Sequence, residues 1–109
     1  MEKPPPRPAA AYATMYPQLC EVARPLGYAL ALHGSLQRDM DLLAAPWVEN
    51  AVSGDELARA LCEAVDGVIV GDGVDKPHGR HAWTIIFQAW GHGFIDLSIM
   101  PLRKQVEPQ

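Results

Sequence analysis

The spacing of apolar residues along the chain changes between a helical period and a strand period, and these changes predict its elements. A first helix is expected over about 10–25, where apolar residues recur at helical spacing. Pro17 either kinks this helix or begins its better-formed half. Gly27 is placed to cap its end. The apolar stripe consists of Leu19, Val22, Ala23 and Leu26.

Two apolar segments after this helix have the length and composition of buried strands. The first is 28–33, and the second is 39–45, which is closed by Pro46. The five residues between them, 34–38, form a turn that is short enough for the strands to pair as a hairpin.

A second helix is predicted from a capping box, in which Ser53 caps the first turn and Glu56 reaches back to it. Gly67 is expected to end this helix. Its core-facing stripe is expected to consist of Leu57, Ala60, Leu61, Ala64 and Val65.

The remaining pattern predicts further strands. A short strand is expected at 68–70, and the glycine- and aspartate-containing segment 71–79 is expected to be a loop. Strong strand patterns at 82–90 and 94–100 flank a tight turn at 91–93. The order of elements predicts an α+β fold, with a small antiparallel or mixed sheet of four to five strands and two helices packed on one face.

Composition favours one small globular domain. The chain has 109 residues, of which 49% are hydrophobic, enough for a single modest core. Residues 1–8 form a proline-rich tail that is expected to be flexible, 9–102 the domain, and 103–109 a polar C-terminal tail.

The net charge of −4 argues against broad nucleic-acid binding. No apolar run has the length of a membrane span, and the N-terminal segment lacks the apolar core of a signal peptide, so a cytoplasmic protein is expected. Cys20 and Cys62 lie in separate helical patterns and are most simply reduced thiols, with a disulfide as the alternative.

Three aspartates lie in apolar segments that are expected to be strands. Asp39 and Asp41 point to the same face of their strand, roughly 7 Å apart at the backbone, and Asp96 joins them if its strand is a neighbour about 5 Å away. Since close carboxylates repel one another unless a cation neutralises them, this pattern indicates Mg²⁺, Mn²⁺ or Ca²⁺. The alternative is an ion-pair network with an arginine such as Arg38 or Arg80.

The segment 33–42 resembles the signature of the nucleotidyltransferase superfamily with the polymerase-beta-like fold. That signature is an apolar strand, Gly-Ser, a short helix, which is missing here, then Asp-x-Asp on the next strand and a third carboxylate on a later strand. The resemblance covers 28–46 and 94–98. Only three residues, 36–38, separate Gly-Ser from Asp-x-Asp, fewer than is usual, so the resemblance is to a minimal or degenerate member.

This resemblance implies a role for each matching residue. Gly34 and Ser35 would contact nucleotide phosphates. Asp39 and Asp41 would hold Mg²⁺ or Mn²⁺, and Asp96 would complete the site and help to activate an attacking hydroxyl. The implied ligand is a nucleoside triphosphate, and the implied reaction is nucleotidyl transfer to a hydroxyl.

Basic residues give a second candidate for phosphate binding. The glycine-containing segment 76–81 holds a lysine, an arginine and two histidines that could bind a phosphate or an acidic partner: Lys76, His78, Arg80 and His81. Arg38 directly precedes the acidic pair. Such a loop is either a solvated turn or a phosphate-binding element that folds over the carboxylates. His33 either faces the same cleft or is a hydrogen-bonded structural histidine.

The three tryptophans, Trp47, Trp83 and Trp90, are expected at the core or the sheet edge, with a base-stacking surface as the alternative. Trp47 is the best placed of them to line a pocket.

The sequence therefore leaves three functional hypotheses. The first is a minimal nucleotidyltransferase. The second is a catalytically inactive module of the same fold that binds a nucleotide or a protein, including a homodimer that covers a sheet edge. The third is a metal-dependent phosphoester hydrolase with a histidine as general base.

Overall fold

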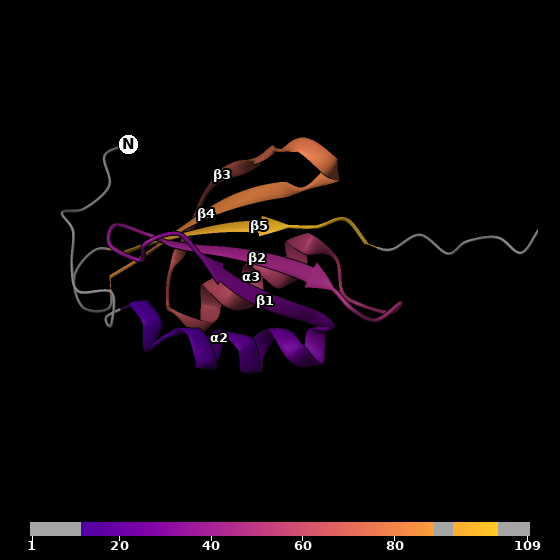
Figure 1. Ribbon diagram of the computed structural model, residues 1–109, viewed down its shortest axis with the longest axis horizontal. Helices are drawn as coiled ribbons and strands as arrows, with labels where there is room; N and C mark the ends of the chain where they lie inside the picture. The colour runs from indigo at the N-terminus through magenta and orange to yellow at the C-terminus, as the bar shows by residue number, and fades with distance from the viewer. Residues whose placement is uncertain (1–11, 89–92, 103–109) are drawn as a thin grey trace, which may run out of the picture.

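The computed structural model describes residues 12–88 and 93–102, which form one mixed five-stranded sheet with two α-helices on one of its faces (Figure 1). The α+β architecture predicted from the sequence is thus confirmed. In chain order the elements are α2 (Tyr16–Ala23), the 3₁₀ turn η1 (Arg24–Leu26), β1 (Tyr28–His33), β2 (Met40–Pro46), α3 (Gly54–Ala64), β3 (Val68–Asp75), the 3₁₀ turn η2 (Pro77–Gly79), β4 (His81–Phe87) and β5 (Gly93–Ile99).

The strand order in the sheet is β1-β2-β5-β4-β3. Strands β1 and β2 pair as the expected antiparallel hairpin, and β3, β4 and β5 form an antiparallel meander. The two halves meet where β2 pairs with β5 in parallel. A parallel pair needs a long crossover connection, which α3, β3 and β4 provide here.

The first helix is interrupted near its start: residues 12–13 are helical, residues 14–15 form a turn, and the regular helix α2 covers Tyr16–Ala23. Pro17 lies in the first turn of α2, where its missing N–H has no intrahelical partner to lose, so it begins the regular helix rather than kinking it. The helix tightens into η1 before Gly27, which ends it in the left-handed conformation (φ 95°) as expected. Residues 10 and 11 of the prediction lie outside the described residues.

The second helix begins as predicted, because the Ser53 Oγ accepts a hydrogen bond of 3.2 Å from the Glu56 amide. Its buried face is rotated from the predicted one: Ala58 and Cys62 are buried, whereas Ala60 and Ala64 are only partly so. Leu57 and Leu61 were placed correctly. The last helical residue is Ala64, and the Gly67 amide closes the end through a 2.9 Å bond to the Cys62 carbonyl.

The prediction of a loop over 71–79 was wrong for its first half. β3 continues to Asp75, and its pairing with β4 shifts between Val70 and Val74. Gly71 and Gly73 have positive φ angles of 68° and 78°, which fit a β-bulge. The glycines that suggested a loop thus bend a strand instead.

The last two strands form the predicted hairpin with adjusted ends. β4 begins at His81, one residue early, and β5 covers Gly93–Ile99. Phe87 pairs with Gly93, where a Cβ atom would come within 2.2 Å of the Phe87 ring. Of the predicted turn at 91–93, Gly93 begins β5, while residues 91–92 and Trp90 lie outside the described residues.

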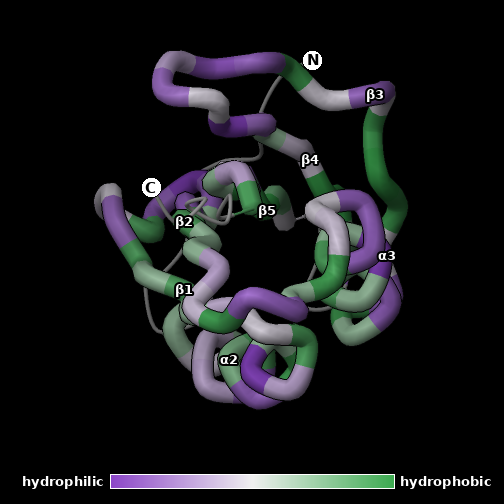
Figure 2. The backbone as a smooth tube through the Cα atoms, turned by 90° about the vertical axis from the view of Figure 1, so that its right-hand side faces the viewer, coloured by the Kyte–Doolittle hydropathy of each residue, from purple (hydrophilic) through white to green (hydrophobic). Residues whose placement is uncertain are grey.

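Each central strand has one face toward the helices and one away from them. Met40, Leu42 and Ala44 of β2 are fully buried among the core residues, whereas the alternate residues of β2 are only partly buried. Figure 2 shows α2 and α3 on the same side of the sheet. Most of the apolar core lies between the helices and the sheet, and the opposite face has no helix over it in the described chain.

Other predictions concern the thiols, the membrane and the sheet edges. Cys20 and Cys62 are free thiols, as expected, and burial raises the pKa of the Cys62 thiol. None of the helices in 12–88 and 93–102 is long and apolar enough to cross a membrane. In the described sheet, β1 and β3 are the edges, and a homodimer across either of them stays a prediction.

Replacing a side chain of the central strand should show how far the fold depends on this core. We expect Leu97→Ala to lower the free energy of unfolding by about 2–5 kcal/mol, because Leu97 is fully buried in β5 and its loss leaves a cavity. The matched control is Leu102→Ala, since Leu102 is 46% exposed and should change stability by less than about 0.5 kcal/mol. Urea denaturation measures the free energy of unfolding of both variants. Equal losses in the two variants would contradict the assignment of Leu97 to the core.

Candidate functional site

The three predicted aspartates come together at the junction of β2 and β5. Asp41 and Asp96 are register partners in the parallel pair, and Asp39 lies one residue before β2. Each residue offers a carboxylate oxygen, and these oxygens all lie within 4.8 Å of one another. All three side chains are partly buried. The convergence that the sequence predicted is present in the structure.

Strand alternation explains why these acids point away from the helices. Met40 and Leu42 are buried in the core on either side of Asp41, so Asp41 must project from the opposite face. Ile95 and Leu97 place Asp96 on that same face. The hydrophobic pattern of each strand therefore fixes the direction of its acid.

The turn between β1 and β2 lies directly against Asp41. Gly34 has a φ of 79°, and a Cβ atom added to it would come within 2.6 Å of Asp41 Oδ2. Only glycine combines this backbone conformation with so close an approach. The neighbouring His33 pairs with Asp41 across the hairpin.

Tyr12 positions the start of both acidic strands, a role that was not predicted. Its hydroxyl donates a 2.9 Å hydrogen bond to the Arg38 carbonyl and accepts one of 3.4 Å from the Phe94 amide. Its ring packs edge-on against Phe87, with centroids 6.1 Å apart. Tyr12 is almost fully buried, and no local motif in the sequence marks contacts with partners so distant in the chain.

Two hydroxyl residues near Asp96 were also missed. Thr84 faces Asp96 in the register of β4 and β5, and its Oγ1 donates a long hydrogen bond of 3.5 Å to Asp96 Oδ1. Ser98, two residues along β5, shares the same face. The two-residue alternation of side chains along 82–86 and 94–98 would have placed both hydroxyl residues on the face of Asp96.

A cleft of about 450 Å³ opens over this face of the sheet. Two acids of the trio, Asp41 and Asp96, line it together with two of the predicted basic residues, so opposite charges share the same hollow, whereas Asp39 does not line it. Its lining residues are His33, Asp41, Val74, Lys76, Arg80, Ala82, Trp83, Thr84, Asp96 and Ser98.

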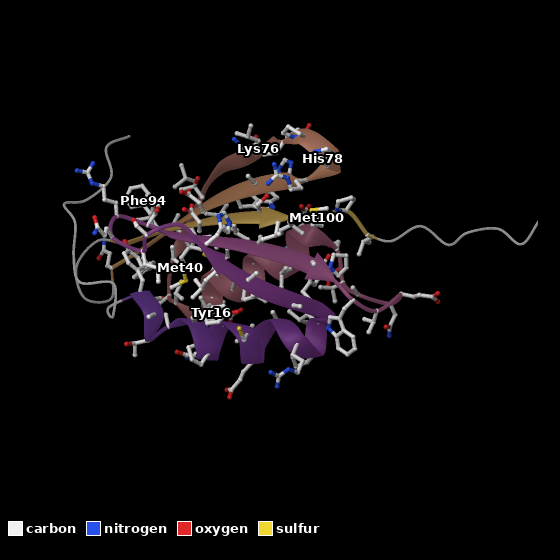
Figure 3. The ribbon with its side chains drawn as sticks, in the orientation of Figure 1. Tyr16, Met40, Lys76, His78, Phe94 and Met100 are labelled. Carbon is white, nitrogen blue, oxygen red and sulfur yellow. The ribbon has the colours of Figure 1, made fainter. Side chains whose placement is uncertain are left out.

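The basic side of the cleft is built by the connection between β3 and β4. Arg80 donates from Nε to the Pro77 carbonyl at 3.1 Å and from Nη1 to Ser98 Oγ at 3.3 Å, which holds its guanidinium beside Ser98 of β5. The Lys76 amide donates to the Arg80 carbonyl at 2.9 Å. Figure 3 shows Lys76 and His78 near the connection between β3 and β4, at the edge of the sheet that lies away from α2.

The other predicted phosphate-binding residues do not line this cleft. Gly34 lies against Asp41 but does not line the cleft. Ser35, Arg38 and His78 are exposed and also lie outside the lining. The Ser35 Oγ accepts a 3.4 Å bond from the Gln37 amide within the turn. Of the predicted basic residues, Lys76 and Arg80 are therefore the two that share the hollow with the acids.

A second hollow, of about 350 Å³, lies beside the outer edge of β1. Trp47 lines it, as expected, and is 60% exposed, whereas Trp83 is partly buried against the core. The remaining lining is mainly apolar, with Arg24 as its charged member: Cys20, Arg24, Tyr28, Ala29 and Leu30.

The acidic cluster fits a hard divalent cation in ligand type. Mg²⁺ binds oxygens octahedrally at about 2.1 Å, so neighbouring ligands lie roughly 3 Å apart and opposite ligands roughly 4 Å apart. The three oxygens lie within 4.8 Å of one another, so side-chain rotations would have to bring them closer together to share one ion.

Searches against protein families, curated proteins and solved structures find no match to the chain. The argument for function therefore rests on the site itself.

Two glycine variants distinguish the effect of backbone strain on stability from the effect of the Gly34 contact on the position of the Asp41 carboxylate. We expect Gly34→Ala and Gly71→Ala each to lower the free energy of unfolding by about 1 kcal/mol, because both glycines have positive φ. Only Gly34→Ala should displace the Asp41 carboxylate, since a Cβ atom at Gly71 would meet no atom within 4 Å. The ¹³C shift of the Asp41 carboxyl group measures this, and equal shifts in both variants would contradict the contact.

Proposed function

We propose that this chain is a small nucleotidyltransferase-like domain that binds a divalent cation and a nucleoside triphosphate and transfers a nucleotidyl group to a hydroxyl. One observation carries the proposal: Asp41 and Asp96 face each other across the parallel strands β2 and β5, with Asp39 beside them. Carboxylates so close together are the usual means of holding the cation in phosphoryl transfer.

The order of the elements supports the same proposal. The Gly-Ser turn follows β1, Asp39 and Asp41 enter the next strand, and the third acid lies on the strand beside it. This is the arrangement that the resemblance to the nucleotidyltransferase superfamily implies. The cleft adds Lys76 and Arg80, whose charges suit phosphate oxygens.

In the proposed reaction, Asp39, Asp41 and Asp96 would hold Mg²⁺ or Mn²⁺, which neutralises charge on the phosphates. Lys76 and Arg80 would bind the phosphate oxygens on the other side of the cleft. The hydroxyl oxygen bonds to the α-phosphorus as the bond from that phosphorus to the bridging oxygen breaks, and pyrophosphate leaves. The hydroxyl proton passes to a carboxylate, for which Asp96 is our candidate.

A metal-dependent hydrolase is the second candidate, and the position of His33 favours it. His33 pairs with Asp41 and lines the same cleft, where it could accept a proton from water rather than from an alcohol. The two reactions share the cation and the phosphate-binding residues, so their products distinguish them.

Cation binding is the first test. We expect Mn²⁺ to raise the melting temperature of the full chain, because it relieves repulsion among the acids and binds only the folded state. Asp41→Asn and Asp96→Asn should each weaken Mn²⁺ binding at least tenfold in calorimetric titration, since each removes one charged ligand.

The matched control is Asp72→Asn, which also removes one negative charge but lies on β3 outside the acidic cluster. It should leave Mn²⁺ affinity unchanged within about twofold. An equal loss in all three variants, or no Mn²⁺ binding to the parent chain, would contradict the proposed cation site.

Product formation is the second test. We expect the chain, with Mg²⁺ and α-³²P-labelled nucleoside triphosphates, to transfer label to an acceptor hydroxyl and release pyrophosphate, and Asp41→Asn to abolish this. Arg80→Ala should raise KM for the triphosphate about tenfold, because it removes a cation from the cleft.

The control for the arginine is Arg59→Ala, since Arg59 lies exposed on α3, away from the cleft lining. Release of labelled nucleotide without transfer would favour the hydrolase. Cation-dependent triphosphate binding with neither product would favour the inactive module.

A further inference from the structure

His81, at the start of β4, lies between two hydrogen-bond acceptors. Its Nδ1 is 2.8 Å from Asp75 Oδ1, and its Nε2 is 2.8 Å from the Asp72 carbonyl oxygen. A neutral imidazole has only one N–H, so one ring nitrogen would face an acceptor with its lone pair. Only the protonated ring donates to both partners.

Both acceptors belong to the bulged part of β3. The bulge brings Gly73 so close to the ring that a Cβ atom there would lie 2.2 Å from His81 Nε2. His81 also packs edge-on against Trp83, with ring centroids 4.7 Å apart. The strand, the bulge and the aromatic contact thus build one defined seat for the imidazolium.

The charged and titratable groups around this seat are few. Asp75 on β3 bonds the ring directly. Asp55 in the first turn of α3 and Tyr28 on β1 line, together with His81, a hollow of about 200 Å³. Asp72 contributes its backbone carbonyl. Arg80 precedes His81, but its guanidinium bonds Ser98 Oγ.

We propose that His81 is a proton-dependent latch that holds the bulged segment of β3 against β4 and thereby fixes the Lys76 side of the cleft. Lys76 directly follows Asp75, and its amide donates to the Arg80 carbonyl at 2.9 Å. Releasing Asp72 and Asp75 from His81 therefore loosens the segment that carries Val74 and Lys76 into the cleft. The latch needs no ligand and does not depend on the proposed reaction.

The direction of the pH effect follows from the two acceptors. The hydrogen bond to Asp75 is the largest cause that raises the pKa of His81, followed by the bond to the Asp72 carbonyl. Partial burial opposes them, and the negative charges of Asp75 and then Asp55 raise the pKa further. A raised pKa in the folded state means that protonation stabilises the latched form. The latch contributes fully below the ordinary histidine pKa of about 6.5 and is lost as the pH rises through the raised value.

NMR on the ligand-free full chain tests this directly. We expect the His81 ring to titrate above pH 6.5. Hydrogen-exchange protection of the Lys76 amide, corrected for the intrinsic pH dependence of exchange, should fall several-fold over the same pH range. A His81 pKa at or below 6.5, or constant Lys76 protection while His81 titrates, would overturn the latch.

Two variants make the test specific. Asp75→Asn should lower the pKa of His81 and remove most of the pH dependence of Lys76 protection, because a neutral amide is a weaker partner for the imidazolium. Asp72→Asn is the matched control, since it removes the same charge from β3 but keeps the backbone carbonyl that His81 uses. If both variants changed the pKa of His81 and the protection of the Lys76 amide equally, the effect would come from overall charge and not from the hydrogen bond to Asp75. That result would overturn the proposal.

These NMR measurements use the ligand-free chain, so their outcome does not depend on cation binding or on nucleotidyl transfer. Failure of cation binding would leave the latch unaffected, and loss of the latch would leave the acids of β2 and β5 in place.

Discussion

The parallel pairing of β2 with β5 is the constraint on which the candidate site depends. In this register Asp41 lies opposite Asp96, while Leu42 and Leu97, the next pair along, are buried together in the core. A slip of one residue would turn the acids of one strand toward the helices and the leucines toward solvent. Since burying an unpaired carboxylate is costly, the same hydrophobic interactions that hold the sheet together also keep the acids on its open face.

The two faces of the sheet therefore have different roles. The face toward α2 and α3 provides most of the apolar burial, whereas the opposite face carries the acids and the cleft. The acids come from the middle of the sheet, and the basic residues come from the hairpin of β3 and β4, so the cleft joins parts of the chain that are distant in sequence. Tyr12 connects the residues just before β2 to the start of β5, because its hydroxyl forms hydrogen bonds with the Arg38 carbonyl and the Phe94 amide.

Signals that act within a few residues predicted the helix ends well, whereas contacts between residues far apart in the chain were harder to predict. The capping serine Ser53 and the terminating Gly27 mark structure within a few residues, which is why both were predicted correctly. Strand alternation predicted the face to which each acid points, but the convergence also required β5 to lie beside β2, which the local pattern does not determine. The continuation of β3 was missed because its glycines serve a bulge, whose pairing partner is a later strand. Tyr12 was missed because its partners are 26 and 82 residues away, beyond any periodic pattern.

The acidic and basic sides of the cleft differ in how firmly the fold holds them. Asp41 lies between fully buried residues of a central strand, so its position changes only if the core does. Lys76 follows an edge strand in which Val68 and Val74 are 67% and 60% exposed, and little apolar burial restrains it. The hydrogen bonds of His81 supply restraint where packing does not. If a ligand binds the Lys76 side better in its latched position, its binding and the protonation of His81 must favour each other, because the coupling between two sites is reciprocal.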